Sequence, residues 1–189
     1  MGRVSKEQME RNRDNIIKAS AELFRERGLD GVSVNDVMTT VGLTHGGFYG
    51  QFSSKDELEA LACQRAFDDV SDAFSLSGIT TFNGLLDSYL SVEHRDNAGH
   101  GCTVTALASD VQRKPLEKPV RQTYIDGLKK MATQLAAIQK NDPDCEPSDI
   151  HLVQLATMTG ALILSRATMG DEFSERFLNA VREHLKKMS

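Results

Sequence analysis

Apolar side chains return at every third or fourth position along nearly the whole chain, and this spacing predicts helices throughout. The segment 33–52 contains two short helical patterns separated by a turn at Gly42. The apolar face of the first pattern consists of Val34, Val37, Met38 and Val41. Ser33 is placed to cap this helix, and Asp36 follows three residues later, as in a capping box.

The second helix is predicted to begin after Thr44 and to last barely two turns. Phe48 and Phe52, four residues apart, form its inward stripe. Its outward face is left to His45, Gly46, Tyr49 and Gly50. Because each glycine weakens a helix by about 1 kcal/mol, this face is suited to close approach to a groove. The sequence therefore predicts a helix-turn-helix that binds double-stranded DNA.

Four motifs follow one another between residues 11 and 61. They are Arg25-Glu26-Arg27-Gly28, the Ser- and Thr-containing helix 33–41, Gly42-Leu43-Thr44-His45-Gly46-Gly47-Phe48-Tyr49-Gly50-Gln51-Phe52, and Ser54-Lys55-Asp56-Glu57-Leu58. In this order they resemble the DNA-binding domain of TetR-family transcriptional regulators. Gln51, where the family often has His, and Gly50, often a larger polar residue, depart from that pattern. The resemblance implies a regulator, most commonly a repressor, that leaves a palindromic operator when an effector binds.

Nine residues are candidates for DNA contact: Ser33, Thr39, Thr40, Thr44, His45, Gly46, Gly47, Tyr49 and Lys55. Thr44 and Lys55, at or beside helix N-termini, are expected to bind phosphate. His45 and Tyr49 are candidates for contacts with base edges or backbone in the major groove. The two glycines between them allow the backbone to approach, and the hydroxyl residues of the preceding helix steady the flanking strand.

The formal net charge of −5 is unusual for a DNA-binding protein until it is divided along the chain. Residues 1–55 contain eight basic and seven acidic side chains, which leaves 14 basic and 20 acidic ones in the remainder. A near-neutral head with a basic N-terminal arm, attached to an acidic body, is oriented by the phosphate field of DNA. The arm taken alone is equally well explained as ordinary solvated charge.

The expected architecture is all-α, with about nine helices and no strand-like alternation. The helices are predicted over residues 5–27, 33–41, 44–52, 54–74, 82–90, 102–111, 116–138, 148–164 and 171–185. The polar, glycine-bearing segment 94–101 and the proline-bearing segment 141–147 are predicted to be loops. We expect a DNA-binding domain over residues 1–55 and a helical ligand-binding and dimerisation domain over residues 56–189.

The resemblance also implies that the last two helices pair with those of a second copy in a four-helix bundle. The interface candidates are Gly160, Ala161, Leu164, Phe173, Phe177, Ala180 and Val181. The alternative is that these residues only fill the core of one subunit. An effector cavity among the central helices would draw on Phe67, Phe74, Leu86, Tyr89, Cys102, Tyr124, Met131 and Met158. Each of these side chains can equally belong to the core.

Gly101-Cys102-Thr103 resembles a Gly-Cys turn found in a subset of TetR-like regulators. A thiol in the first turn of a helix meets the positive end of the helix dipole, which lowers its pKa, and His94 or His100 would add to this effect. Cys102 is therefore either a sensor of electrophiles or oxidants or a small buried core residue. A metal site formed by these two histidines and the thiol lacks any diagnostic spacing.

Composition excludes several other classes of protein. The chain is 40% hydrophobic and 26% charged, has no signal peptide, and lacks the roughly 18 uninterrupted apolar residues of a membrane span. Three widely spaced cysteines indicate free thiols, and we expect a cytoplasmic protein. No metalloprotease, phosphate-loop or nucleophile motif is present, and no cofactor is expected. The remaining alternatives are a helical partner-binding adaptor without DNA affinity and an enzyme that uses the helical cavity.

Overall fold

The computed structural model describes residues 5–188, and within that range the chain is entirely helical. The elements are α1 (Lys6–Arg27), α2 (Val34–Thr40), η1 (His45–Gly47), α3 (Lys55–Leu76), α4 (Phe82–Tyr89), α5 (Val92–Asp96), η2 (Ala98–His100), α6 (Thr103–Arg113), α7 (Pro119–Lys140), α8 (Asp149–Ala167) and α9 (Phe173–Met188). The predicted all-α class is confirmed. The start of the basic arm, with Arg3, lies outside the described residues.

The first two helices begin and end where their capping residues predict. Ser5 Oγ accepts a hydrogen bond from the backbone N–H of Gln8 at 3.2 Å. Gly28 ends α1 with a φ of 78°, a left-handed value that glycine adopts without steric cost. At α2, Ser33 and Asp36 form a complete capping box. Local sequence thus determines the bounds of both helices.

The prediction of a two-turn helix after Thr44 is wrong. Only three residues, those of η1, form a 3₁₀ helix, and the following four residues are turns. Thr44 makes no side-chain cap. Glycines at positions 46, 47 and 50 remove the propensity that an isolated two-turn helix needs, so the segment is shaped by the burial of Phe48 and Phe52.

The prediction of a loop over residues 94–101 is also wrong, because this segment is mostly helical. Ser91 Oγ caps α5 by accepting from the backbone N–H of His94, and η2 follows directly. Arg166 of α8 donates to the backbone carbonyl oxygens of His94 and Arg95, each at 3.0 Å. The number of α-helices in the described chain agrees with the predicted nine only because the unpredicted helix α5 offsets the predicted helix 44–52, which does not form.

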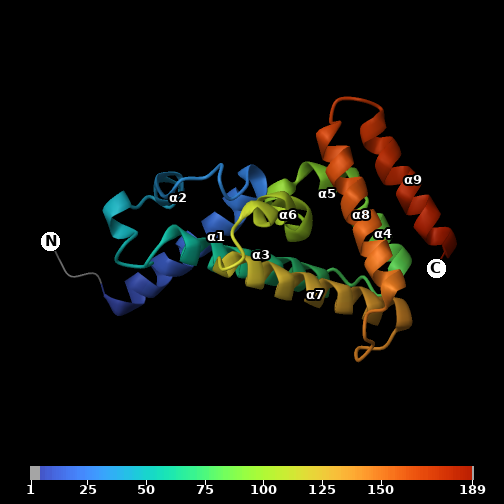
Figure 1. Ribbon diagram of the computed structural model, residues 1–189, viewed down its shortest axis with the longest axis horizontal. Coiled ribbons are helices and arrows are strands. Elements are labelled where there is room, and N and C mark those ends of the chain that lie inside the picture. The colour runs from blue at the N-terminus through green and yellow to red at the C-terminus, as the bar shows by residue number, and fades with distance from the viewer. Residues whose placement is uncertain (1–4, 189) are drawn as a thin grey trace.

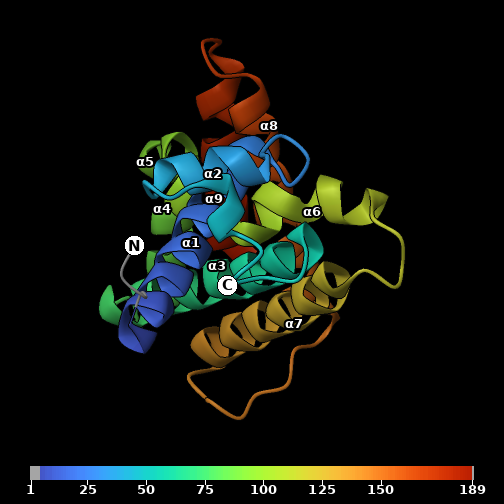
Figure 2. The same cartoon turned by 90° about the vertical axis from the view of Figure 1, so that its left-hand side faces the viewer.

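The molecule is elongated, with the N-terminal helices at one end and the α8–α9 hairpin at the other (Figure 1). The long helices α3 and α7 pack against each other and run lengthwise between these ends. Helix α6 contacts α1, α3, α7 and α8, so it lies at the centre of the fold. Figure 2 looks onto the N-terminal end, where α1 and α2 lie in front of the body. We call α1, α2 and η1, with the loops that connect them, the head, and we call the helices from α3 to α9 the body.

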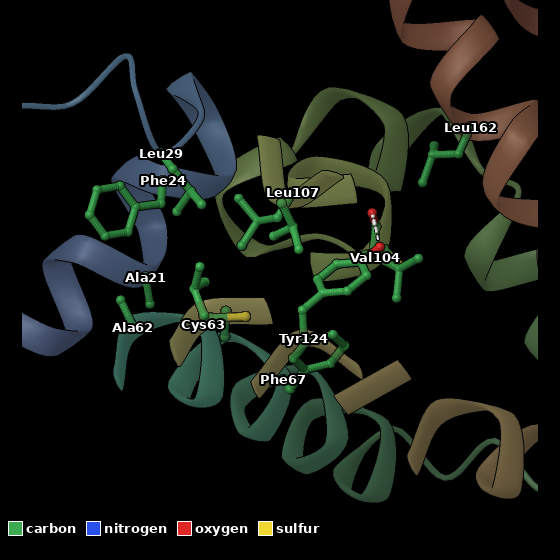
Figure 3. Packing of buried hydrophobic residues seen from close by; sticks show 14 of the residues in the cluster. Ala21, Phe24, Leu29, Ala62, Cys63, Phe67, Val104, Leu107, Tyr124 and Leu162 are labelled. Atoms are coloured by element: carbon green, nitrogen blue, oxygen red, sulfur yellow. Dashed lines mark hydrogen bonds between the residues drawn. The ribbon is translucent and has the colours of Figure 1, made fainter. Parts of the chain in front are cut away.

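One hydrophobic core connects the head to the body (Figure 3). Phe24 and Leu29 of the head lie on one side of Leu107 in α6, and the rings of Phe67 and Tyr124 lie on the other side. Gly127 permits this packing of α3 on α7, because a Cβ at this position would lie 2.3 Å from the Phe67 ring. The head is therefore packed onto the body through α6 and α3.

Helix α8 alone among the described helices is long and apolar enough to span a membrane by length and composition. Of its most apolar 18-residue window, 44% is buried inside the structure. It packs extensively on α9 and also contacts α6 and α7. These contacts make it a core helix of the body.

Candidate functional site

The turn that follows α2 is anchored from behind by two phenylalanines. Phe48 and Phe52 are 0% and 3% exposed, and their rings stack with centroids 5.3 Å apart. The guanidinium of Arg13 in α1 lies over the Phe52 ring at 4.4 Å and also donates to the carbonyl oxygen of Gln51. Arg13 further pairs with Glu57 at 2.8 Å. This arrangement fixes a segment that has little helical propensity of its own.

On the opposite side of the same turn, the candidates Thr44, His45, Gly46, Gly47 and Tyr49 are all exposed. Tyr49 is 66% exposed, and its ring makes edge contacts with those of His45 and Phe48 at 5.8 and 5.2 Å. No described neighbour lies within 4 Å of a Cβ built at Gly46. We call residues 44–50 the reader surface. It is a protruding surface with an aromatic side chain, an imidazole and open backbone.

The α2 candidates Ser33, Thr39 and Thr40 are exposed beside the reader surface. The Ser33 hydroxyl lies 2.6 Å from the Asp36 carboxylate, and Thr40 Oγ1 donates to the Asp36 carbonyl oxygen at 2.9 Å. Both hydroxyl hydrogens are therefore used within α2 and its cap, and Ser33 Oγ also accepts the backbone N–H of Asp36 at 3.2 Å. The hydroxyl of Thr39 has no such internal bond among the contacts of α2.

The structure does not support the phosphate contact expected of Lys55. Its ammonium donates to the Leu29 carbonyl oxygen at 2.6 Å and lies 3.5 Å from the carboxylate of Glu59, which is 2% exposed. The charge of Lys55 thus closes the loop after α1 instead of facing outward. Lys18 of α1 is exposed near Thr40 and has no hydrogen bond or ion pair in the described chain, although the sequence analysis did not single it out.

A cavity of about 430 Å³ lies between α3, α4, α5, η2, α6, α7 and α8. Five of the eight candidates line it: Phe74, Tyr89, Cys102, Met131 and Met158. Phe67, Leu86 and Tyr124 do not. The Phe67 ring packs against Gly127, Tyr124 donates to the Val104 carbonyl oxygen at 3.1 Å, and Leu86 is 0% exposed. These three positions are corrected to core: Phe67 and Tyr124 are held in the contact between α3 and α7, and Leu86 of α4 is fully buried in the hydrophobic core.

The sequence analysis placed His94 and His100 beside the Cys102 thiol but missed the rest of the polar lining. The whole polar lining consists of Ser77, Ser88, Ser91, Glu93, His94, Asn97, His100 and Gln134. Most of these residues belong to the segment 88–100, part of which was predicted to be a loop. The sequence feature that pointed to these residues was the high density of polar side chains just before Cys102. This density does not indicate whether the side chains face the cavity or the solvent.

Cys102 is 1% exposed and begins α6 at the edge of the cavity. Its backbone N–H donates to His94 Nε2 at 3.0 Å, and His94 Nδ1 lies 2.7 Å from the Tyr89 carbonyl oxygen. Nδ1 therefore carries the hydrogen, and the lone pair of Nε2 is already engaged by a backbone donor. Burial lowers the pKa of His94, so the ring is neutral at pH 7. This histidine is positioned to hold the start of α6 and not to deprotonate the thiol.

At its other end, α6 holds the loop between α1 and α2. Asp110 Oδ2 accepts the backbone N–H of Leu29 at 2.8 Å in a buried bond. Just beyond the helix, Lys114 pairs with Asp30 at 2.8 Å and with Glu59 at 3.2 Å. One helix therefore connects the cavity to the head by direct polar contacts.

The outer faces of α8 and α9 carry exposed apolar side chains: Leu152, Val153, Ile163, Leu164, Phe173 and Met188. Among the interface candidates, Leu164 and Phe173 are 47% and 50% exposed, and Ala180 is exposed. Gly160, Phe177 and Val181 are partly exposed. Ala161 is 3% exposed, so its assignment to an interface is wrong; it packs in the hydrophobic core of the subunit.

The described residues contain no group of three or more His, Cys, Asp or Glu side chains that could hold a metal ion. What this arrangement offers is a small exposed surface for a macromolecule and a separate cavity for a small molecule. The two lie in different parts of the fold, and α6 contacts both α1 of the head and the helices α7 and α8 beside the cavity.

Comparison with known proteins agrees with this division. Residues 16–60 match the family described as "Bacterial regulatory proteins, tetR family". An uncharacterised HTH-type transcriptional regulator in the lacX 3′ region of Lactococcus lactis subsp. lactis is 24% identical, over 93% of this chain and 94% of its own. The HTH-type transcriptional repressor DhaR of Mycobacterium sp. (strain GP1) is also 24% identical, over 92% and 91%.

The fold is shared with solved regulators as well. The crystal structure of a TetR transcriptional regulator from Chloroflexus aurantiacus J-10-FL superposes with a TM-score of 0.71 at 24% identity, covering 96% of this chain and 95% of that one. The matched helix-turn-helix and the shared whole-chain fold agree with the geometry of the head and body. Residues 16–60 thus carry the helix-turn-helix DNA-binding domain of the TetR family, and along nearly its whole length the chain is similar to helix-turn-helix transcriptional regulators.

Proposed function

We propose that this protein is a homodimeric repressor that binds an inverted-repeat operator and releases it when a small molecule enters the cavity. The observation that carries the proposal is the reader surface, whose exposed residues are held in place by buried Phe48 and Phe52. His45 and Tyr49 are the proposed contacts to base edges, Thr44 is the proposed phosphate contact, and Ser33 with Thr39 or Thr40 steadies the flanking strand. Residues 1–55 act as the DNA-binding domain and residues 56–189 as the ligand-binding and dimerisation domain of a cytoplasmic protein.

A second copy is needed because one reader surface covers only half of a palindromic site. The exposed apolar residues of α8 and α9 supply a surface for it: Gly160, Leu164, Phe173, Phe177, Ala180 and Val181 lie on these two helices. A built Cβ at Gly160 meets nothing within 4 Å, which leaves room for a partner helix to approach closely. Pairing of two hairpins would give a four-helix bundle.

Release of DNA is proposed to pass through α6. Helix α6 begins directly after Cys102, which lines the cavity. Further along the helix, Asp110 accepts the backbone N–H of Leu29 in the loop that precedes α2. A ligand that shifts the start of α6 would therefore move this loop and with it the reader surface. Such a ligand must bind the DNA-free arrangement more tightly than the DNA-bound one.

DNase I footprinting on the DNA that flanks the gene tests the proposal. The expected footprint is an inverted repeat whose half-site centres lie about 34–36 Å apart or slightly more. Tyr49→Ala should abolish the footprint, whereas Leu76→Ala, which removes a side chain that is 87% exposed far from the head, should leave it unchanged. If no DNA is protected although the protein is folded and dimeric, the adaptor function is correct instead.

A reactive effector at Cys102 is the second candidate, favoured by the position of this thiol at a helix N-terminus in the cavity wall. Cys102 would then be modified by an electrophile or oxidant that has entered the cavity. The test compares operator release by peroxide in wild type and Cys102→Ser. If the variant binds the operator normally and still responds, a reversible, non-covalent effector is the correct interpretation.

A further inference from the structure

Apart from its two histidines, the cavity lining carries formal charge of one sign only. Glu93 is the single carboxylate in its lining, and no lysine or arginine lines it. Glu93 lies at the exposed rim, in the first turn of α5, and its carboxylate has no hydrogen bond or ion pair in the described chain. An unpaired carboxylate therefore remains available to a ligand.

The two histidines of the lining do not reverse this charge. Burial lowers the pKa of His94, and both of its ring nitrogens are occupied by backbone groups. His100 lies 3.2 Å from Asn97 Oδ1 and 3.7 Å from the carboxylate of Glu22 in α1. A second carboxylate thus stands behind the rim of the cavity.

Two arginines, Arg25 and Arg166, stand near the Cys102 wall of the cavity without lining it. Arg25 is engaged by Asp69 and by the Ala66 carbonyl oxygen. Arg166 lies beside His94 but directs its guanidinium at two carbonyl oxygens, those of His94 and Arg95, at 3.0 Å each, and it is absent from the lining. The N-terminus of α6 at Cys102 is the one feature of this wall that would favour an anion. Its cap N–H is already bound to His94 Nε2.

The rest of the wall is apolar and aromatic. Phe74 and Tyr89 offer rings, and Met131 and Met158 offer polarisable thioethers. Aromatic faces attract cations, whereas an anion in such surroundings loses hydration with nothing to replace it. A volume of about 430 Å³ lies in the range of sites for small organic molecules.

We propose that the cavity binds a small lipophilic organic cation, an amine or quaternary ammonium, with its charge beside Glu93 and its hydrocarbon part against Phe74, Met131 and Met158. The proposal rests on the function proposed above, in which this cavity is the effector site. It adds the chemical class of the effector, which excludes anionic carboxylates and phosphates.

Saturation-transfer NMR titrations with three benzyl-type probes test the class. Benzyltrimethylammonium is cationic, N,N-dimethylbenzamide is neutral and phenylacetate is anionic, and all three share one ring and a similar size. The cation should bind the full-length protein at least about tenfold more tightly than phenylacetate and more tightly than the amide. Equal or tighter binding of phenylacetate, equal binding of the amide, or binding of none of the three would overturn the proposal.

Glu93→Gln locates the charge, because it removes the negative charge and keeps the shape of a side chain that has no partner to lose. Its affinity for the cation should fall about fivefold, the size expected of a partly exposed ion pair, while that for the amide stays unchanged. Glu146→Gln, an exposed change in the loop before α8, should alter neither affinity. If Glu93→Gln leaves the affinity for the cation unchanged, Glu93 is not the counter-charge and the proposal fails.

Gel-shift titrations of the operator, run without any probe, keep the two proposals apart. A protein that binds the cation selectively but shifts no DNA would refute the repressor function and leave the ligand class intact. A protein that shifts its operator but does not prefer the cation would refute only the ligand class.

Discussion

Replacing Asp110 by alanine should loosen the connection between α6 and the head. Asp110 is 8% exposed, and its Oδ2 accepts the backbone N–H of Leu29, a residue that is 0% exposed. The other carboxylate oxygen receives the guanidinium of Arg113. The substitution removes the acceptor for Leu29 without offering water a path to that N–H.

The expected loss of stability follows from the backbone N–H of Leu29, which Asp110→Ala leaves without an acceptor. A buried N–H without an acceptor costs about 1–3 kcal/mol, and the bond lost here is to a charged acceptor, which belongs to the upper half of that range. Alanine returns about 0.5 kcal/mol through its higher helix propensity. The free energy of unfolding should therefore fall by about 2 kcal/mol. Asp110→Asn retains an amide oxygen for Leu29 and should lose about half as much.

Urea denaturation followed by circular dichroism measures this change. Asp126→Ala is the matched control, because Asp126 is an exposed helical aspartate that accepts a hydrogen bond from Gln122 at 2.9 Å. The control should shift the free energy by no more than about 0.5 kcal/mol.

The same variants then test whether effector binding in the cavity is transmitted to the head through α6. Effector binding should weaken the operator affinity of Asp110→Asn less than that of wild type, since the α6 contact with the loop is weakened. If Asp110→Ala unfolds at the wild-type urea concentration, the Leu29 bond carries no stability and the reasoning from burial is refuted. If stability falls but the response to effector is unchanged, the signal does not pass through this contact.

Four further outcomes are expected. Gly127→Ala should lower the free energy of unfolding by about 1–2 kcal/mol, because its Cβ would lie 2.3 Å from the Phe67 ring, and a second change of Phe67 to Leu should recover part of the loss in urea denaturation. Lys55→Ala should reduce stability but leave the slope of log operator affinity against log salt unchanged, whereas loss of a true phosphate contact lowers that slope by about 0.9. Glu57 has its pKa lowered from 4.5 to about 2 by the guanidinium that pairs with it, so its stabilising effect is complete above pH 4.5 and is lost as the pH falls toward 2; in Glu57→Gln the urea midpoint should depend less on pH in that window. Leu164→Glu should give a monomer in sedimentation velocity that no longer protects the operator, and a dimer of wild-type affinity would refute the assigned interface.

Much of the fold was predictable from the sequence, because local chemistry decides where its helices start and stop. Ser5, Ser33 and Ser54 cap helices that begin at the following residue, and Gly28 ends α1 in a left-handed conformation. The periodic apolar positions identified the inward faces, including Phe48 and Phe52. Residue order in the helix-turn-helix was specific enough to identify the family.

Local propensity failed where the backbone is held by residues distant in sequence. The turn after Thr44 is too rich in glycine to be a regular helix, and its shape comes from Arg13 and the buried phenylalanines. The segment before Cys102 is helical because Arg166, more than 70 residues away, donates to its carbonyl oxygens. No pattern within either segment contains that information.

The roles of single side chains were decided by tertiary structure for the same reason. Helical periodicity states which face is buried but not against what, so Phe67 and Tyr124 were assigned to a cavity although they pack between α3 and α7. It also left Lys55 free for DNA, although its ammonium donates to the carbonyl oxygen of Leu29, 26 residues earlier, and pairs with the buried carboxylate of Glu59 one turn along α3. The sequence determined most of the helices, the resemblance to the family and the position of the helix-turn-helix segment. Only the packing of distant helices decided which side chains remain free to bind, because burial and ion pairing depend on neighbours that the linear order does not specify.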